Sequence, residues 1–351
     1  MSVIQSAISR LVEDRDLDES KAEEVMKQIM SGEATPAQIG AFLSALHIKG
    51  ETPSEIAAFA RVMRQFASKI DPKVDDVLVD TCGTGGDQID TFNISTSAMF
   101  VAAGAGVLIA KHGNRSVTSK SGSADIMETL GVEIDLPPVR VERAIENAGL
   151  GFMFAPRFHK AMKHAIGPRK EVGLRSAFNI LGPLTNPAGA RVQLMGVYDA
   201  SLTEKLAQVL KKLDCKRAMV VHGLDGLDEI STLGPTRISE LDGDKIETYT
   251  IEPGDFGIPK AEPEEISGGN AEENARILLR VLGGEKGPHR DITLLNGAAA
   301  ISLSGRANSL GEGLELARKS VDSGRAYKKL ERLIEATDGS MRRLKELEES
   351  L

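Results

Sequence analysis

The stretch VDTCGTGGDQIDTFNISTSAMFVAAGAGVLIAKHGNRSVTSKSGSAD, residues 79–125, decides the fold of this chain. It contains two glycine-rich loops, and each follows a short apolar run that is typical of a buried strand. The run at 77–80 leads into Gly-Thr-Gly-Gly-Asp, and the run at 106–110 leads into Lys-His-Gly-Asn-Arg. Two strand-to-loop units of this kind predict an α/β protein with neighbouring strands in one sheet.

Both loops are suited to binding an anion. Closely spaced glycines allow several backbone N–H groups to converge on one anion, because no Cβ blocks the approach. A helix expected to begin near Ser95 adds further donors and a partial positive charge. We expect Lys111, Arg115 and Lys120 to supply mobile positive charge, and the serine and threonine hydroxyls of 116–123 to donate hydrogen bonds. The stretch therefore predicts a site for a pyrophosphate or a sugar phosphate.

The alternative is that the glycines only close tight strand-to-helix turns. One loop alone would leave that alternative open, since short glycine motifs have many false positives. Two loops with the same composition favour the binding interpretation. Neither loop matches the P-loop or the dinucleotide-binding template, so we do not expect a nucleoside triphosphate or dinucleotide site.

Composition sets limits on the class of protein. The chain has 351 residues, of which 41% are hydrophobic and 27% are charged, as is ordinary for a globular protein with a sizeable core. Its net charge of −8 argues against a general nucleic-acid binder. Cys82 and Cys215 lie far apart and form no metal or disulfide motif, so a reduced, cytoplasmic setting is expected. The longest apolar stretch, 98–110, is too short to span a membrane.

Residues 1–70 read as helices. Thr35-Pro-Ala-Gln and Thr52-Pro-Ser-Glu are both capping boxes with proline at the first helical position, and Gly32 and Gly50 stand where helices should end. The apolar side chains that follow the boxes offer more surface than a small helical layer can bury alone, and they predict a homodimer through these helices: Ile39, Phe42, Leu46, Ile56, Phe59 and Met63.

Strands then alternate with helices, which predicts a mainly parallel sheet covered on both faces. Ligands in such sheets bind at the carboxyl ends of the strands, where both glycine loops are expected. After the loops we expect strands at 131–136, 151–155, 192–198 and 218–221, helices at 139–148 and 202–213, antiparallel strands within 230–260, and helices at 270–282, 292–303, 310–334 (interrupted at Gly324) and 341–351.

Two further segments carry charge that bears on function. Residues 156–187 are strongly basic within an acidic chain, and a rigid turn, Gly-Pro-Leu-Thr-Asn-Pro, closes the segment at 182–187. Asp228 and Glu229 follow the strand at 218–221 and should lie at the same sheet edge as the glycine loops. Adjacent carboxylates are often only exposed turn residues, but Mg²⁺ is typically held by one or two of them together with phosphate oxygens.

These motifs together resemble the anthranilate phosphoribosyltransferase family, which belongs with the nucleoside phosphorylase-like phosphoribosyltransferases. The likeness rests on Asp-Thr-x-Gly-Thr-Gly-Gly-Asp at 80–87, Asn-x-Ser-Thr at 93–96, the motif from Lys111 to Asp125, and the turn at 182–187. It covers essentially the whole chain. It implies an α/β fold with a mainly parallel central sheet covered by helices and a small all-helical domain. The small domain comprises residues 1–72, joined by helices from about 168–187, and residues 73–351 form a large α/β domain that binds phosphoribosyl pyrophosphate.

The resemblance also implies the reaction. The phosphoribosyl group of 5-phosphoribosyl-1-pyrophosphate passes to the amine of anthranilate, in tryptophan biosynthesis, and pyrophosphate leaves. Such chemistry needs Mg²⁺, fixed hydrogen-bond donors and proximity, and no catalytic acid, base or nucleophile is assigned. The implied partners are the two small molecules and a second copy of the chain, with neither nucleic acid nor membrane.

Site residues follow from the resemblance position by position. The donor, phosphoribosyl pyrophosphate, is expected at Gly83, Gly86, Asp87, Thr91, Asn93, Ser95, Thr96, Lys111, His112, Gly113, Asn114, Arg115, Ser116, Val117, Thr118, Ser119 and Ser123. Metal binding is expected at Ser95, Asp228 and Glu229. Anthranilate is expected at Gly83, Asn114 and Arg169, with His112, His159 and Pro183 as pocket walls. Gln88 departs from the family, which commonly has a small residue there, and this difference puts affinity in question.

Two other functions remain open from the sequence. A pyrimidine nucleoside phosphorylase has a similar fold and uses inorganic phosphate, but the Asp228-Glu229 pair and the Lys-His-Gly-Asn-Arg loop argue against it. A non-enzymatic relative that binds nucleic acid through a basic groove is disfavoured by the intact Gly-Thr-Gly-Gly-Asp loop and by the net charge of −8.

Overall fold

The computed structural model describes residues 2–86, 89–116 and 120–351. Its N-terminal part consists of four helices, α1 (Val3–Val12), α2 (Glu19–Ser31), α3 (Pro36–Lys49) and α4 (Pro53–Phe66). Both predicted capping boxes are confirmed, because the Thr35 and Thr52 hydroxyls accept the backbone N–H groups of Gln38 and Glu55. Gly32 and Gly50 end α2 and α3, as predicted.

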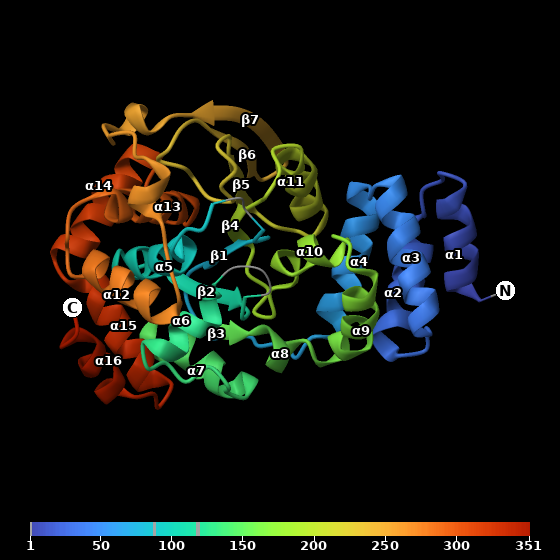
Figure 1. The fold of residues 1–351 in the computed structure, drawn as a ribbon, viewed down its shortest axis with the longest axis horizontal. Helices are drawn as coiled ribbons and strands as arrows, with labels where there is room; N and C mark the ends of the chain where they lie inside the picture. The colour runs from blue at the N-terminus through green and yellow to red at the C-terminus, as the bar shows by residue number, and fades with distance from the viewer. Residues whose placement is uncertain (1, 87–88, 117–119) are drawn as a thin grey trace.

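A single seven-stranded sheet forms the centre of the rest of the chain (Figure 1). Its strands are β1 (Leu78–Gly83), β2 (Leu108–Gly113), β3 (Leu150–Phe154), β4 (Val192–Gly196), β5 (Arg217–Gly223), β6 (Thr236–Asp242) and β7 (Lys245–Ile251). The order is β3-β2-β1-β4-β5-β6-β7; the first five strands are parallel, and β6 and β7 add an antiparallel margin. The chain order reverses at β1 and β4, which is the point where open α/β sheets bind ligands.

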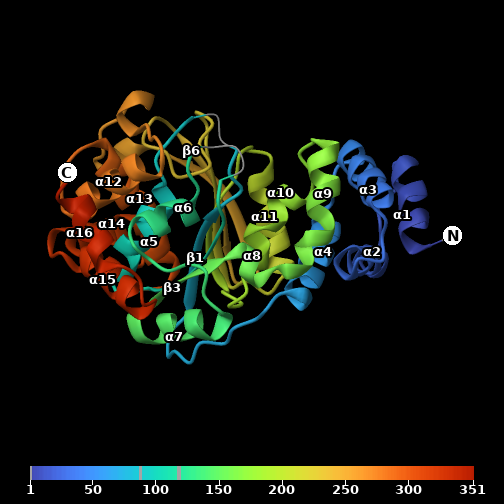
Figure 2. The same ribbon diagram turned by 60° about the horizontal axis from the view of Figure 1, so that its bottom comes forward.

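Alternate residues of each central strand face two different apolar cores. In β4, Val192 and Leu194 lie in one core, whereas Met195 belongs to the other, as the two-residue period of a strand requires. Figure 2 shows the sheet between the two helical layers. One layer contains α5 (Ile94–Gly104), α12 (Ala271–Leu282), α13 (Pro288–Leu303), α14 (Leu310–Asp322), α15 (Arg325–Ala336) and α16 (Met341–Glu348). The other contains α11 (Leu202–Lys212), which packs on the N-terminal helices.

The basic segment connects the sheet to the N-terminal helices. It forms α8 (Ala155–Phe158), α9 (Lys163–Val172), α10 (Phe178–Leu181) and the 3-10 turns η1 (Lys160–Met162) and η2 (Pro183–Thr185). Helix α9 packs against α2 and α3, and η2 packs against α4. Because the same apolar cluster also includes side chains of β4, β5 and α11, the domain boundary at residue 72 stays a prediction.

One predicted strand is wrong. Residues 131–136 form no strand but connect α6 (Ser123–Thr129) to α7 (Pro138–Ala148). The backbone of this connection is bonded to the C-terminal helices instead of the sheet, since Ser340 donates to the Gly131 carbonyl and the Glu133 N–H donates to the Thr337 hydroxyl. The other strands and helices predicted after residue 137 are present, and two 3-10 turns, η3 (Pro253–Phe256) and η4 (Pro263–Ile266), complete the fold.

The apolar side chains expected on the outside of the N-terminal helices are buried within the chain. Ile39, Phe42, Leu46, Ile56, Phe59 and Met63 have exposed fractions of 0–4%. Helices α1 and α9 pack on α3, and α2 and α11 pack on α4, so the prediction that a partner must bury these side chains is wrong. None of the helices that the structure describes is long and apolar enough to cross a membrane.

Candidate active site

Asp228 lies directly on the first glycine loop. Its Oδ2 accepts the backbone N–H of Gly85 at 2.8 Å. A Cβ on Gly83 would lie 2.6 Å from that oxygen, and a Cβ on Gly196, which is paired with Gly83 across β1 and β4, would overlap the Asp228 carbonyl. Glycine is thus required at both positions by the close approach of Asp228. Burial raises the pKa of the Asp228 carboxyl group.

Glu229 reaches the start of α5. Its Oε1 accepts the backbone N–H of Ser95 at 3.1 Å, in the first turn of the helix, where a carboxylate is favoured by the helix dipole. The structure thus places Glu229 on Ser95 and its neighbour Asp228 on the first glycine loop, while metal binding at Ser95, Asp228 and Glu229 stays a prediction. Within the described residues, no three His, Cys, Asp or Glu side chains form a metal cluster. Two carboxylates and a hydroxyl still fit Mg²⁺, which commonly takes its remaining ligands from substrate phosphates and water.

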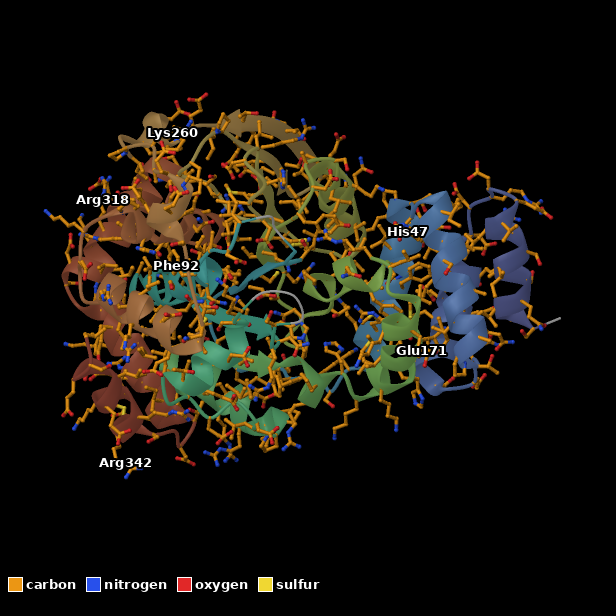
Figure 3. All side chains as sticks on the ribbon, in the orientation of Figure 1. His47, Phe92, Glu171, Lys260, Arg318 and Arg342 are labelled. Carbon is orange, nitrogen blue, oxygen red and sulfur yellow. The ribbon has the colours of Figure 1, made fainter. Side chains whose placement is uncertain are left out.

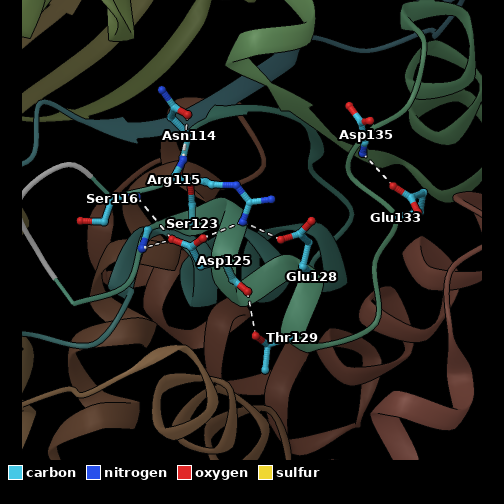
Figure 4. A network of polar contacts seen from close by, with 10 residues as sticks. Asn114, Arg115, Ser116, Ser123, Asp125, Glu128, Thr129, Glu133 and Asp135 are labelled. Carbon is cyan, nitrogen blue, oxygen red and sulfur yellow. Dashed lines mark hydrogen bonds and ion pairs between the residues drawn. The ribbon is translucent and has the colours of Figure 1, made fainter.

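The second glycine loop is organised by Asp125 in the first turn of α6 (Figure 4). The Asp125 carboxylate accepts the N–H groups of Gly122 at 2.9 Å and Ser116 at 3.3 Å. Arg115 donates to Asp125 at 2.8 Å and pairs with Glu128 at 2.6 Å. The hydrogen bonds to Glu128 and Asp125 raise the pKa of Arg115. All these partners lie within fifteen residues of one another, so the loop is built from its own sequence.

The expected mobile cations are already engaged in the structure. Lys111 is only 2% exposed, and its Nζ donates to the Thr81 carbonyl and to the Ser95 hydroxyl, the latter at 3.4 Å. Lys120 pairs with Asp90 at 3.4 Å. For Lys111 the expectation of mobile charge was wrong, because Lys111 lies inside β2 and its Nζ is bonded beside the start of α5. It supplies a fixed positive charge at that helix end.

A buried carboxylate, Asp80, holds the proline-rich turn against the sheet. Asp80 accepts the Asn186 Nδ2 group at 2.8 Å and the His112 N–H at 3.2 Å. The same Asn186 group donates to the Ala110 carbonyl at 2.8 Å. Burial raises the pKa of Asp80 to about 6, although Lys111 opposes the shift. The turn that contains Pro183 is therefore fixed beside β1 and β2.

His112 and His159 form a pair of neutral rings next to this turn. Their centroids lie 5.0 Å apart. Burial lowers the pKa of His112 to about 3 and that of His159 to about 4. Neither Nε2 atom has a hydrogen-bond partner among the described residues. Buried polar atoms without a partner are uncommon in folded proteins, so these two ring nitrogens are candidates for contact with a ligand.

Arg169 and Asn114 approach the site from different elements. Arg169, half-buried on α9, places its guanidinium carbon 5.0 Å from the centre of the Phe178 ring. Burial lowers its pKa. Asn114 is exposed after β2, and its Oδ1 accepts the Arg115 N–H at 2.8 Å. The structure records no direct contact that joins the two, so their shared role remains a prediction.

Several other residues expected to bind phosphoribosyl pyrophosphate lie near the start of α5 or at the ends of the second glycine loop. Asn93 donates to the Ser121 carbonyl at 3.2 Å and accepts from Asn274 of α12 at 3.0 Å. The Thr96 hydroxyl is buried and has no partner among the described residues. Thr91 forms an isolated bridge with Ser267. Gly113 and Ser123 lie side by side, since a Cβ on Gly113 would overlap the Ser123 hydroxyl. Asp87, Gln88, Val117, Thr118 and Ser119 lie outside the described residues.

Two residues near the site were missed by the sequence reasoning. Arg175, between α9 and α10, donates to the Gly86 carbonyl at 2.9 Å. Its guanidinium carbon lies 4.3 Å from the centre of the Tyr198 ring, and the Tyr198 N–H donates to the Thr84 hydroxyl at 3.2 Å. Both residues thus restrain the first loop. No local motif marks them, because the contacts join positions about a hundred residues apart.

The fold and the site define a class. Residues 75–327 match the model of the glycosyl transferase family, a/b domain, and residues 5–67 match that family's helical bundle domain. The chain therefore combines the α/β domain and the helical bundle domain of this transferase family.

Relatives define the family within that class. The chain is 55% identical to the anthranilate phosphoribosyltransferase of Acetivibrio thermocellus, covering 96% of this chain and 97% of the relative. It is also 55% identical to that of Methanocorpusculum labreanum, covering 96% and 99%. Among solved structures, the Thermus thermophilus enzyme matches with a TM-score of 0.90 at 43% identity, covering 95% of this chain and 99% of that one. The Saccharomyces cerevisiae enzyme in complex with PRPP and Mg matches with a TM-score of 0.88 at 30% identity, covering 95% and 98%. The chain belongs to the anthranilate phosphoribosyltransferase family.

Proposed function

We infer that the chain transfers the phosphoribosyl group of 5-phosphoribosyl-1-pyrophosphate to the amine of anthranilate. The products are N-(5-phosphoribosyl)anthranilate and pyrophosphate, and the reaction is a step of tryptophan biosynthesis. One observation carries this function: the Asp228 carboxylate lies on the first glycine loop while Glu229 lies on the first turn of α5. This arrangement places two carboxylates beside two groups of backbone donors, as a magnesium pyrophosphate requires.

The donor occupies the carboxyl edge of β1 and β2. Backbone N–H groups of the two glycine loops and of the α5 start bind its phosphates, and the buried Lys111 ammonium stabilises their charge. Ser95, Asp228 and Glu229 hold Mg²⁺, which when bound supplies Lewis-acid stabilisation to the leaving pyrophosphate. The remaining contacts to phosphoribosyl pyrophosphate come from the residues predicted from the resemblance, including Asp87, Val117, Thr118 and Ser119.

The acceptor lies between the second loop and the basic segment. Anthranilate is a flat ring with one carboxylate, and a planar guanidinium such as that of Arg169 suits this group. The neutral His112 and His159 rings and Pro183 form the walls of the pocket. They exclude water and hold the amine close to the ribose, so that the reaction gains from proximity and needs no protein nucleophile.

A homodimer in the cytoplasm completes the proposal. The buried apolar side chains of the N-terminal helices do not support a dimer, but Ile48 near the end of α3 is 83% exposed and Val12, the last residue of α1, is 73% exposed. These two provide apolar surface for a two-fold contact. Light scattering at micromolar concentration should return twice the monomer mass of 37.5 kDa, and a monomer mass would contradict the dimer.

The reaction itself has a simple test. Anthranilate fluorescence should fall when purified protein, 5-phosphoribosyl-1-pyrophosphate and Mg²⁺ are mixed, and should not fall when any one of them is omitted. Stable fluorescence in the complete mixture, with protein that unfolds cooperatively, would contradict the function. Replacing the donor with ribose 1-phosphate or with inorganic phosphate and a nucleoside tests a phosphorylase activity with the same protein.

A further inference from the structure

The segment 224–235 between β5 and β6 contains Asp228 and Glu229, and we call it the carboxylate loop. Asn296, in the middle of α13, bonds to its backbone. Its side chain is fully buried. The Oδ1 atom accepts the Ile230 N–H at 3.0 Å, and the Nδ2 group donates to the Ile230 carbonyl at 2.9 Å. The Nδ2 group also donates to the Ile292 carbonyl, one turn earlier in α13, at 2.9 Å. One amide thus satisfies both backbone groups of a residue outside its own helix.

These bonds act on Glu229, because Ile230 is the next residue in the chain. Its N–H belongs to the peptide group that joins Glu229 to Ile230. Asn296 therefore restrains the peptide bond of Glu229 itself, while the Glu229 side chain bonds to the Ser95 N–H at 3.1 Å. The segment between β5 and β6 has no regular secondary structure that could hold this peptide in place.

The same helix also contacts the other half of the site. Ile292, one turn before Asn296, packs in one apolar cluster with Leu227 of the carboxylate loop and with Phe92 and Ile94 at the start of α5. Figure 3 labels Phe92 in the larger part of the molecule. At the residue directly after Asn296, a Cβ on Gly297 would lie 3.0 Å from Val101 of α5, so the two helices pack closely. Helix α13 thus sets the distance between α5 and the carboxylate loop.

A merely structural role would be the simpler explanation. The neighbours of Asn296 on α13 are buried and largely apolar, so an apolar side chain would fill the space. An asparagine there must satisfy its own amide, and it does so through the loop backbone. Removing it leaves the Ile230 N–H and carbonyl buried without these partners, and the loop can then shift to find others.

We propose that Asn296 is a positioning residue that fixes the Glu229 carboxylate relative to the start of α5, and so sets the affinity of the site for magnesium pyrophosphate. This inference rests on the proposed function of Ser95, Asp228 and Glu229 as the metal site. Groups that hold a metal ligand in place commonly change metal affinity by about 10- to 100-fold when removed.

The test compares Asn296→Ala with Ser320→Ala. Ser320 is a matched control because it is buried on α14 and donates to the Val101 carbonyl of α5 at 2.7 Å, in the same core but away from the carboxylate loop. Calorimetric titration of the full-length proteins with Mg²⁺ and pyrophosphate should show an affinity about tenfold weaker for Asn296→Ala and unchanged for Ser320→Ala. In kinetics, the Mg²⁺ concentration for half-maximal rate should rise with Asn296→Ala, while the KM for anthranilate stays within about twofold.

Each outcome decides the inference. If Asn296→Ala lowers the melting temperature but binds magnesium pyrophosphate as Ser320→Ala does, Asn296 is only structural and the inference is wrong. Asp228→Ala tests the proposed metal site separately from the role of Asn296. If Asp228→Ala does not weaken the binding of magnesium pyrophosphate, the metal site itself is misplaced and the inference fails with it. Should Asn296→Ala not fold, Asn296→Asp keeps the acceptor for the Ile230 N–H and loses the donor to its carbonyl. That variant should weaken binding in the same direction, and wild-type affinity would overturn the inference.

Discussion

The two glycine loops carry similar residues but are held in different ways. The loop after β2 is organised by Asp125, ten residues from the Arg115 side chain that it binds. The loop after β1 is held by Asp228 and Arg175, which are 143 and 89 residues away from the loop positions they contact. The main anchor of one loop, Asp125, lies within ten residues of it, whereas the anchors of the other are brought to it by the assembled fold.

This difference indicates a division of roles. A locally organised loop can hold its backbone donors before the rest of the protein contributes. A loop held by Asp228 and Arg175 adopts its conformation only when the sheet edge and the basic segment are in place. We therefore expect changes in the distant anchors to affect metal-dependent chemistry most, and changes in the local anchor to affect mainly donor affinity.

The largest effect is expected when the distant carboxylates are removed. Replacing Asp228 and Glu229 together with alanine removes both charged metal ligands and the partner of the Gly85 N–H. Turnover should fall by about a thousandfold, because several kcal/mol of charge stabilisation are lost. Steady-state rates across a Mg²⁺ titration measure this, with cooperative thermal unfolding as the control for folding. Wild-type rates at every Mg²⁺ concentration would remove the metal assignment.

The next largest effect is expected from Arg169, which belongs to neither glycine loop. It tests whether anthranilate binds separately from the two loops. Arg169→Ala should raise the KM for anthranilate while the KM for 5-phosphoribosyl-1-pyrophosphate stays nearly unchanged. Loss of a charge-assisted hydrogen bond costs about 1.5–3 kcal/mol, or about 10- to 150-fold in kcat/KM. Varying each substrate in turn provides the measurement. A larger effect on the donor than on the acceptor would show that the acceptor site is misplaced.

A smaller effect is expected from the local anchor. Asp125→Ala removes the acceptor of the Gly122 and Ser116 N–H groups, and so loosens the second loop. The KM for the donor should rise about 3- to 10-fold, since the carboxylate is partly exposed and its hydrogen bonds contribute about 1 kcal/mol. Asp125→Asn, which keeps an acceptor, should recover part of the affinity. If Asp125→Ala instead matched the loss caused by the carboxylate double variant, the two loops would not differ in role.

The last effect concerns stability instead of catalysis: a pH dependence of stability from the histidine pair. Burial lowers the pKa of His112 to about 3 and that of His159 to about 4, below the value of about 6.5 in unfolded chains. The unfolded state therefore binds more protons as the pH falls. The stabilisation is complete above pH 6.5 and is lost toward pH 4, with a slope of up to about 1.4 kcal/mol per pH unit for each ring.

Urea denaturation at pH 7 and pH 5 measures this loss. His112→Gln should lose about 1–2 kcal/mol less than the wild type between these two pH values. His47→Gln, which changes an exposed histidine on α3, provides the matched control. Equal slopes for the wild type and His112→Gln would show that the buried ring is not kept neutral by the fold.

Local patterns predicted much of this architecture. The capping boxes at Thr35 and Thr52 and the interruption at Gly324 depend on neighbours within a few residues, and the structure has all of them. The strand predicted at 131–136 failed because its alternation of apolar residues did not reveal that the C-terminal helices would bind its backbone. The apolar faces of α3 and α4 were likewise assigned to a partner, when α9 and α11 cover them.

The site was predictable where its residues lie in motifs and not where the fold brings single residues in. Asp228 and Glu229 follow a strand and could be placed at the sheet edge. Arg175, Asn186 and Asn296 contact the site across 66 to 106 residues of sequence, and no spacing marks them. Lys111 belongs to a motif, but its burial beneath α5 depends on the position of a helix that precedes it.

The most direct test of the central claim is a crystal structure of the protein with 5-phosphoribosyl-1-pyrophosphate and Mn²⁺ in place of Mg²⁺. Mn²⁺ gives an anomalous signal that distinguishes the metal from water and from the lighter atoms of the protein and the donor. We predict that the anomalous peak lies at coordination distance from Asp228 or Glu229 and from the pyrophosphate. The phosphates should lie on the backbone of the first glycine loop and the start of α5. A donor bound at this edge with its metal away from both carboxylates, or a donor bound elsewhere, would contradict the account.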